Sequence, residues 1–468
     1  MQVAVIGCGY VGLVAAACLA ELGHDVICVD TDREKITLLN SGESLIHEEY
    51  LPELLCRHRG KRLFFSWDLE EAVRQSLIVI IAVGTPANES GDADLSYVET
   101  ATREIAKALN SHKTIVEKST VPVQTNAWIE RAMALNGCSA SDFDVVSNPE
   151  FLREGTAVTD FLYPDRIIVG SRNHRAAKLM RQLYGKLLDG SYSVGEGAIP
   201  APDDAASVPL YMDTSPETSE LIKHASNAFL AMKISFINAV SVIAEATGAD
   251  IEDVRVGLGS DKRIGSAFLR AGIGYGGSCF PKDVSAFQAI AAACGTDFKL
   301  LQDVRQINED QLKRFVAMVR KALWTVKGKR LAVLGLAFKS DTDDVRESPA
   351  IKVIRELLEQ ECQITVYDPG AMERARIVLK DSVNYAAEPY LAMNDADALL
   401  ILTEWKEFAK LDLTRVRTLL KYPIVLDGRN LYSPGQMREA GLNYYSIGRP
   451  PVEVLHPVPA RANVAKIG

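Results

Sequence analysis

The sequence of 468 residues lacks the patterns that mark several classes of protein. Its eight cysteines are scattered without a CxxC pair, and its seven histidines show no metal-ligand spacing, so we expect free thiols, a reducing compartment and no metal site. The net charge is −9 and no basic stripe follows an expected helix, which argues against nucleic acid as a partner. An anionic substrate remains compatible with this charge, because backbone amides and a few cations can bind phosphate locally.

The chain also lacks segments that would direct it to a membrane. The opening residues, MQVAVIGCGY, enter a strand pattern at once and have no basic region before an apolar one. No apolar run reaches about 18 residues, the length that suggests a membrane span. We therefore expect a cytoplasmic protein with no membrane partner.

Short runs rich in Val and Ile alternate with amphipathic segments in the first third of the chain. Such runs predict parallel strands that are buried on both faces, and hence a doubly wound α/β domain. The expected strands are 2–7, 25–30, 77–84, 114–119, 144–150 and 166–170. A second alternation near the carboxyl end predicts another βαβ-type sheet, with strands at 329–338, 364–369, 398–405 and 422–428.

Two segments of different character separate these sheets. A stretch rich in Gly, Pro and Asp at 189–207 predicts a loop or flexible insertion. A long helical pattern then runs from about Ser215 to Thr247, with Ser215 as N-cap and Pro216 at the first helical position. This helix could be a connecting spine and dimer surface, or a plain structural helix. The expected domains are 1–205, 206–320 and 321–450, followed by a poorly ordered tail at 451–468.

A glycine motif follows the first expected strand. Gly7, Gly9 and Gly12 form GxGxxG, in which the first glycine permits a tight turn, the second admits a pyrophosphate and the third allows close helix packing. Tyr10 and Val11 lie inside the motif. Asp30 ends the next strand, where a carboxylate binds ribose hydroxyls and repels a 2′-phosphate, so we expect NAD rather than NADP.

Residues at the carboxyl ends of later strands are further candidates for cofactor contacts. Gly84, Thr85, Ser119 and Thr120 follow such strands, and this edge of an open parallel sheet binds the ligand. Ordinary turn residues are the alternative from the pattern alone.

A dense glycine loop leads to Cys279 in the segment GIGYGGSCFPKD, residues 272–283. Pro281 suits the first turn of a helix starting near Ser278, which would put Cys279 at a helix N-terminus and lower its pKa, with Lys282 nearby. Asp283 would share a helix face with Cys279. A buried, inert cysteine is the alternative, but beside a bound dinucleotide a thiolate could attack an aldehyde and allow a second oxidation to a carboxylate through a thioester.

Several polar residues could support this chemistry. Lys223 and Asn227 share a helix face and could stabilise an oxyanion, or form an exposed polar stripe. Glu150 could act as a general base with Thr120, or be an ordinary acid at a strand end. The second sheet has only Gly335 in its first turn, so we expect a different nucleotide diphosphate there. Candidate cations lie along this half of the chain: Arg263, Lys339, Arg346 and Arg429.

These segments together resemble the UDP-glucose/GDP-mannose dehydrogenase family. The resemblance extends over nearly the whole chain and is most specific in 117–123, 148–157, 220–231, 263–283, 334–348 and 427–430. It implies two Rossmann-like domains joined by a helical linker that forms a homodimer or higher homo-oligomer. Phe280 makes it more similar to the UDP-glucose members, for which the implied reaction is the four-electron oxidation of UDP-glucose to UDP-glucuronate with two NAD. One departure is the stretch 189–207, which the family usually keeps shorter.

The resemblance also implies individual roles. Cys279 matches the nucleophile, Lys223 and Asn227 the oxyanion-stabilising pair, Asp283 the acid that positions water or Lys223, and Glu150 with Thr120 the water-activating group. The implied NAD contacts, besides the glycine motif and Cys279, are Asp30, Lys35, Gly84, Thr85, Thr120, Glu154 and Arg346. The implied substrate contacts are Glu150, Phe151, Leu152, Glu154, Lys223, Asn227, Arg263, Phe268, Tyr275, Gly276, Lys339 and, across a dimer, Arg429.

Three other functions fit parts of the pattern. The same chemistry could act on GDP-mannose or a UDP-N-acetylhexosamine. A two-electron hydroxyacid dehydrogenase would have no use for Cys279. A silent nucleotide-binding protein would bind without forming NADH, and the intact set of Cys, Lys, Asn and Asp argues against it.

Overall fold

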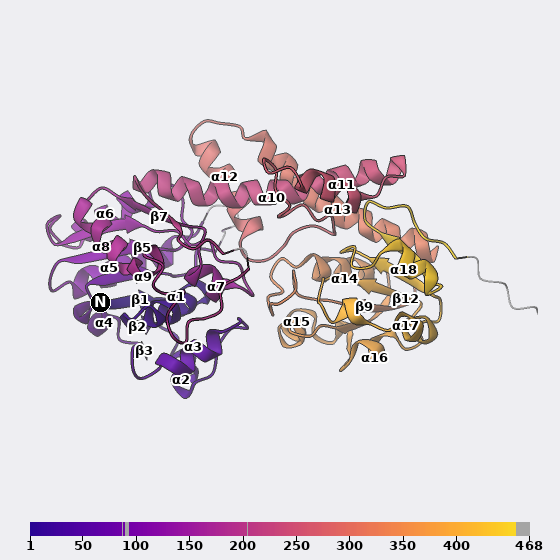
Figure 1. The fold of residues 1–468 in the computed structure, drawn as a ribbon, viewed down its shortest axis with the longest axis horizontal. Helices are drawn as coiled ribbons and strands as arrows, with labels where there is room; N and C mark the ends of the chain where they lie inside the picture. The colour runs from indigo at the N-terminus through magenta and orange to yellow at the C-terminus, as the bar shows by residue number, and fades with distance from the viewer. Residues whose placement is uncertain (87, 89–92, 204, 455–468) are drawn as a thin grey trace, which may run out of the picture. The chain divides into compact units, whose positions relative to one another are not determined.

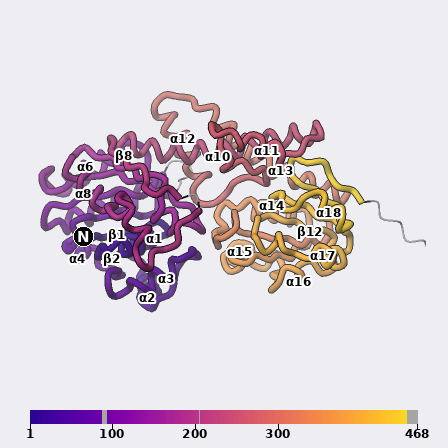
Figure 2. The backbone as a smooth tube through the Cα atoms, viewed as in Figure 1, coloured from indigo at the N-terminus to yellow at the C-terminus, as the bar shows by residue number. Residues whose placement is uncertain are grey.

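A computed structural model describes residues 1–86, 88, 93–203 and 205–454. The chain forms two compact units. The first contains residues 1–232, 276–305 and 341–343, and the second contains 233–275, 306–340 and the chain from 344. Figure 2 traces the backbone through both units. The division of the chain into three domains stays a prediction, and the tail expected to be poorly ordered lies outside the described residues from 455 on.

The first unit is built on an eight-stranded sheet in the order β3-β2-β1-β4-β5-β6-β7-β8. The strands are β1 Gln2–Ile6, β2 Asp25–Val29, β3 Leu63–Ser66, β4 Ile78–Ile81, β5 Lys113–Glu117, β6 Phe143–Ser147, β7 Arg166–Ser171 and β8 Leu210–Thr214. The six predicted strands are all present. The prediction that they are all parallel is wrong at one position, because β7 pairs with β6 in the antiparallel direction.

Helices cover both faces of this sheet, as a doubly wound domain requires (Figure 1). One buried cluster packs α1, α3, α7 and α8 on one face, and another packs α4, α5 and α6 on the other. The helices are α1 Tyr10–Glu21, α2 Arg33–Ser41, α3 Leu51–His58, α4 Leu69–Gln75, α5 Ser96–Ala108, α6 Thr125–Leu135, α7 Ala157–Leu162, α8 His174–Leu183 and α9 Gly185–Leu188.

The stretch 189–207 contains neither helix nor strand among its described residues, in agreement with the predicted loop. It nevertheless packs on the first unit, because Tyr192 and Ile199 are buried in its core. The Tyr192 hydroxyl accepts the Ile199 N–H at 3.0 Å, and Tyr163 donates to the Ile199 carbonyl. The loop therefore covers apolar surface of the sheet domain.

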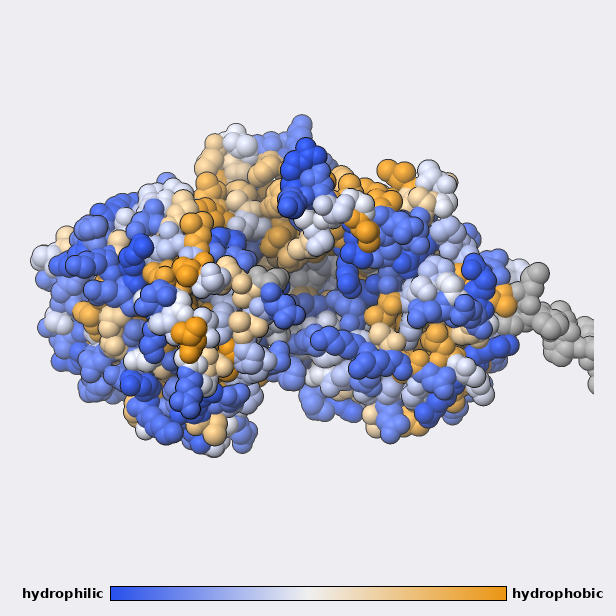
Figure 3. Space-filling model, in the orientation of Figure 1, coloured by the Kyte–Doolittle hydropathy of each residue, from blue (hydrophilic) through white to orange (hydrophobic). Residues whose placement is uncertain are grey.

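The long helix is α10 Pro216–Thr247. Ser215 Oγ accepts the Thr218 N–H at 3.2 Å, which confirms the predicted N-cap. Contrary to expectation, α10 is long and apolar enough to pass for a membrane span by length and composition, which is weak evidence because core helices pass the same test. Hydrophobic residues gather over the helices of this region in Figure 3, and α10 exposes five large ones: Leu221, Phe229, Phe236, Val242 and Ile243.

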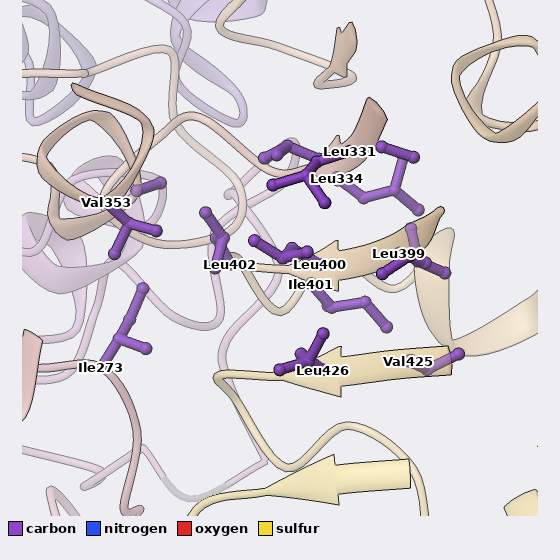
Figure 4. Close-up of a cluster of buried hydrophobic side chains, with 14 of the residues drawn as sticks. Ile273, Leu331, Leu334, Val353, Leu399, Leu400, Ile401, Leu402, Val425 and Leu426 are labelled. Atoms are coloured by element: carbon purple, nitrogen blue, oxygen red, sulfur yellow. The ribbon is translucent and has the colours of Figure 1, made fainter. Parts of the chain in front are cut away.

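The second unit has a six-stranded parallel sheet in the order β11-β10-β9-β12-β13-β14. Its strands are β9 Arg330–Leu334, β10 Gln363–Tyr367, β11 Asn384–Tyr385, β12 Ala398–Ile401, β13 Ile424–Asp427 and β14 Asn443–Ser446. Figure 4 shows side chains of β9, β12 and β13 packed into its core. All four predicted strands are present, and β11 and β14 add an edge on each side.

The remaining helices complete the chain. They are α11 Ile251–Gly259, α12 Phe280–Ala293, α13 Lys299–Leu323, α14 Pro349–Glu359, α15 Met372–Leu379, α16 Pro389–Met393, α17 Leu413–Leu419 and α18 Pro434–Glu439, with short 3₁₀ turns at Lys380–Ser382 and Phe408–Lys410. All eight cysteines are free. Among the described residues, no group of three His, Cys, Asp or Glu side chains could hold a metal ion.

Candidate active site

The turn between β1 and α1 has the geometry of a dinucleotide site. Gly7 takes a φ of +107°, and a Cβ added there would lie 2.5 Å from the Ala82 carbonyl oxygen. A Cβ at Gly12 would lie 1.8 Å from the Gly7 carbonyl oxygen, so this glycine permits close packing of helix and strand. A Cβ at Gly9 would meet no described atom within 4 Å, and no described side chain caps α1 at this N-terminus. The open space and unsatisfied N–H groups fit a pyrophosphate.

Asp30 lies directly beyond β2, next to this turn. Its carboxylate accepts the Cys8 N–H at 2.8 Å and the Asp32 N–H at 3.0 Å. The half-buried carboxylate thus sits against the glycine turn, as a ribose-binding acid requires. Lys35, on α2, pairs with Asp32 at 3.8 Å on the surface. Tyr10 donates to Glu48, whose other oxygen accepts the Ala157 N–H at 2.6 Å.

Hydrogen bonds join the segments that follow β4 and β5 at their carboxyl ends. Thr85 Oγ1 donates to the Thr120 carbonyl at 2.8 Å, and Ser119 Oγ donates to the Val83 carbonyl at 2.9 Å. Gly84 follows in the same segment and leaves open space, with no described atom within 4 Å of an added Cβ. These residues therefore line the ligand edge of the sheet as predicted, although a NAD contact for each of them stays a prediction.

Cys279 is the N-cap residue of α12, with Pro281 in the first turn, as predicted. The Asp283 N–H donates to the Cys279 carbonyl at 2.8 Å, which closes that turn. The expected lowering of the thiol pKa is wrong for the free protein. Burial first, and then the charges of Glu150 and Asp283, raise the pKa of Cys279 to about 11, against the opposing effect of Lys223.

Lys223 and Glu150 form a buried ion pair. The Lys223 Nζ lies 2.8 Å from Glu150 Oε1, and the side chains are 5% and 6% exposed, which excludes the alternative of an exposed stripe. Burial lowers the pKa of Lys223, but Glu150, Asp283 and Cys279 raise it more, so the ammonium stays charged. Glu150 also accepts the Leu152 N–H. A fixed cation beside the thiol is suited to stabilising a developing oxyanion.

Asn227 and Asp283 form the second buried pair of the site. Asn227 Nδ2 donates to Asp283 Oδ2 at 2.5 Å, and the Lys282 ammonium lies 2.7 Å from Asp283 Oδ1. Burial raises the pKa of Asp283, but Lys282 and Lys223 outweigh it, so the carboxyl pKa lies below its usual value. Asp283 is thus an anion that orients the Asn227 amide and uses one of its two N–H groups, so the second N–H is left to donate elsewhere.

The loop after β6 carries three further predicted residues. Phe151 packs beneath two cations, with the Arg166 guanidinium 4.1 Å and Lys223 Nζ 5.4 Å from the ring centre. Leu152 packs against the core of the first unit. Glu154 Oε1 accepts a hydrogen bond from Ser278 Oγ at 3.0 Å. The loop therefore joins the strand edge to the segment that carries the cysteine.

The other predicted residues belong, except Gly276, to the second unit. Arg429 donates to the carbonyls of Leu402, Gly274 and Phe338, and so holds the loop before Tyr275 against its own sheet. Arg346 pairs with Asp344 at 2.6 Å. Arg263 pairs with Asp261 on the surface. The backbone of Phe268 has a φ of +61°, and the Tyr275 side chain is buried. The Lys339 ammonium lies 5.6 Å from the centre of the Phe338 ring. Their ligand contacts stay predictions.

Two residues near the site were missed by the sequence interpretation. Ser278 contacts both Glu154 and the Cys279 sulfur. Lys118, in the motif EKSTVPV, is buried and donates to the Asn148 carbonyl at 3.3 Å, two residues before Glu150. A lysine inside a run that reads as a buried strand was the available signal, since lysine is rarely buried without a partner.

The chain is similar to known proteins over nearly its whole length. The chain is 44% identical to UDP-glucose 6-dehydrogenase TuaD of Bacillus subtilis (strain 168) over 457 residues, covering 97% of this chain and 95% of the relative. It is 44% identical to UDP-glucose 6-dehydrogenase of Rhizobium meliloti (strain 1021) over 464 residues, covering 96% and 100%. The solved UDP-glucose dehydrogenase from Pyrobaculum islandicum superposes with a TM-score of 0.84 at 38% identity, covering 96% and 97%.

Models of three domains of one family match successive parts of the chain. The NAD binding domain matches residues 1–188, the central domain 217–310 and the UDP binding domain 332–434. With its dinucleotide turn and buried cysteine site, the chain belongs to the UDP-glucose/GDP-mannose dehydrogenase family.

Proposed function

We propose that this protein is an NAD-dependent UDP-glucose 6-dehydrogenase that converts UDP-glucose, two NAD and water to UDP-glucuronate and two NADH. The observation that carries the proposal is the half-buried Cys279 with the buried residues Lys223, Glu150, Asn227 and Asp283, beside a sheet edge with a dinucleotide turn. Its substrate is supported by the similarity to UDP-glucose 6-dehydrogenases over nearly the full chain.

The residues of the first turn fit NAD. The Gly7–Gly12 turn would hold the pyrophosphate, and Asp30 would hold the adenosine ribose. When bound, NAD supplies the two-electron oxidant that the reaction needs twice. Thr85 and Thr120, at the adjoining strand ends, would hold its other half against the cysteine segment.

Cys279 supplies the nucleophile between the two oxidations. Its sulfur attacks the aldehyde carbon, and the carbonyl electrons move to the oxygen, which becomes an oxyanion. The Lys223 ammonium and the Asn227 amide stabilise this oxyanion, and both are already held by carboxylates that cannot leave their buried positions without cost. The enzyme is thus organised for a charge that appears only during the reaction.

The hemithioacetal carbon then gives up a hydride, for which the second NAD would be the acceptor, and the C–O bond becomes the carbonyl of a thioester. Hydrolysis of this thioester needs an activated water. Glu150 lies near both Cys279 and Lys223, and its carboxylate can accept a proton from water as Lys223 shifts to the oxyanion. Attack of that water on the thioester carbon breaks the C–S bond and releases the carboxylate with the thiol restored. Thr120, at the end of β5, is proposed to orient the water.

The test is the amount of NADH formed per UDP-glucose when sugar is limiting and NAD is in excess. A ratio of about two is expected for oxidation through a thioester. A ratio near one would mean that oxidation ends at the aldehyde, so the role of Cys279 would be wrong. Formation of NADH only with GDP-mannose or a UDP-N-acetylhexosamine would move the proposal to that substrate, and nucleotide binding without any NADH would favour a silent binder.

We also propose that the chain forms a homodimer through α10. The five large hydrophobic side chains that α10 exposes would otherwise face water. Light scattering should give twice the chain mass of 51.1 kDa or a larger multiple, and the Phe229→Glu/Phe236→Glu variant should lower it. A wild-type protein of single-chain mass would contradict this.

A further inference from the structure

A hydroxyl group connects the sulfur of Cys279 to a carboxylate. Ser278 Oγ lies 3.5 Å from Cys279 Sγ and donates to Glu154 Oε1 at 3.0 Å. An ionised carboxylate only accepts hydrogen bonds, so the hydroxyl proton belongs to the bond with Glu154. The Ser278 oxygen is then left to accept the S–H of the thiol, and the three groups form a directed chain from sulfur to carboxylate.

The other charged groups around the sulfur are already engaged with one another. Glu150, on the loop after β6, holds Lys223 of α10. Asp283, on α12, holds Asn227 and Lys282. Within the part of the chain that the structure describes, Ser278 is the hydrogen-bond partner of the Cys279 sulfur. A half-buried thiol beside two carboxylates does not ionise readily, so it needs a path for its proton when it reacts.

We propose that Ser278 and Glu154 are a proton relay that activates Cys279. The inference rests on the proposed role of Cys279 as nucleophile. As the C–S bond forms, the S–H bond breaks and its proton passes to Ser278 Oγ, while the hydroxyl proton of Ser278 passes to Glu154. The carbonyl electrons move to oxygen, so the negative charge leaves Glu154 and appears on the oxyanion near Lys223. No oxidant or reductant takes part in this step.

The relay and a purely electrostatic role for Glu154 predict opposite effects of one substitution. Glu154→Gln removes a negative charge near the thiol. If charge alone mattered, the thiolate would form more easily and Cys279 would react faster. If Glu154 accepts the proton, the variant loses its acceptor and Cys279 reacts more slowly.

The experiment measures the alkylation rate of Cys279 by iodoacetamide in the full chain between pH 6 and 10, by mass spectrometry of the peptide that contains it. Cys279 is partly accessible, so the reagent can reach it. At pH 7 we expect Glu154→Gln and Ser278→Ala to slow alkylation about tenfold, the effect of one pKa unit. Ser278→Thr, which retains a hydroxyl, should restore most of the rate.

Ser285→Ala is the matched control, because Ser285 is a nearby hydroxyl, on α12, that donates to the Pro281 carbonyl. It should leave the pH profile of alkylation unchanged. Circular dichroism spectra separate misfolding from loss of the relay, and the Thr variant keeps the test valid if Ser278→Ala unfolds. Faster alkylation in Glu154→Gln, or an unchanged rate in a folded Ser278→Ala, would overturn the relay. Full activity of Cys279→Ala would instead overturn the proposed function, whatever these rates are.

Discussion

Cys279 is the nucleophile of the proposed reaction. Because the sulfur has to form the covalent intermediate, Cys279→Ala should reduce NADH formation from UDP-glucose by roughly a thousandfold or more. Cys294, which is exposed beyond the end of α12, provides the control, and Cys294→Ala should keep normal turnover. Initial rates at saturating NAD measure both variants. Substantial activity in Cys279→Ala would point to a dehydrogenase without a covalent step.

The buried pair of Lys223 and Glu150 should also matter for stability. Lys223→Met leaves the Glu150 carboxylate without its cation, so we expect the free energy of unfolding to fall by about 3–5 kcal/mol. The double variant with Glu150→Gln removes both charges and should recover most of this loss. Urea unfolding measures it. Lys327→Met breaks a pair with Glu361 that is 73% and 64% exposed, and as a control it should cost no more than about 1 kcal/mol.

At the scale of elements, two glycines in the turn from β1 into α1 have different roles: Gly9 leaves space for a ligand, and Gly12 allows the helix to pack against the strand. Gly9→Ala adds a methyl group to open space, so the fold should survive while NAD binding weakens by at least about tenfold. Gly12→Ala puts a methyl group against the Gly7 carbonyl, so it should destabilise the unit by about 1–3 kcal/mol or more. Thermal unfolding and NAD titration distinguish them. Equal loss of stability in both variants would contradict this division of roles.

The junction of α6 and α10 should make stability depend on pH. Glu220, on α10, accepts the N–H groups of Gln124 and Asn126 at the start of α6. Burial, opposed by these bonds, raises the pKa of Glu220 from 4.5 to about 7. The folded state then holds this proton more tightly than the unfolded state, so its contribution falls as pH rises from about 4.5 to 7.

Glu220→Gln tests this dependence, because an amide can still accept one of the N–H bonds without carrying a charge. The variant should gain stability relative to the native chain above pH 7 and lose that advantage below pH 4.5. Urea midpoints at several pH values measure it. A difference that does not change with pH would show that the pKa of Glu220 is not raised.

At the scale of the whole molecule, we expect the two compact units to unfold in two steps, and each ligand to raise the unfolding temperature of the unit that binds it. NAD should stabilise the first unit and UDP the second, each by about 2.7 kcal/mol at a ligand concentration one hundred times its Kd. Scanning calorimetry with each ligand measures the shifts. A single transition that both ligands raise equally would mean that the units unfold together.

Much of the site could be predicted because its parts are local. The glycine turn, the position of Asp30 and the N-cap positions of Cys279 and Ser215 each depend on a few neighbouring residues. Strand patterns located every core strand of both sheets for the same reason. The edge strands β3, β8, β11 and β14 were missed, since edge positions need little continuous apolar sequence.

Only the tertiary structure decided the pKa of Cys279, the direction in which β7 pairs with β6, and which side chains contact each other in the site. The helix position of Cys279 suggested a low pKa, but burial first, and then the charges of Glu150, which lies 129 residues earlier, and of Asp283 raise that pKa to about 11. The antiparallel pairing of β7 with β6 and the contact between Ser278 and Glu154 likewise join residues distant in the chain. The sequence by itself determined the elements and the chemical groups, because these follow from local periodicity and residue type, whereas charge interactions depend on distances that exist only after the chain has folded.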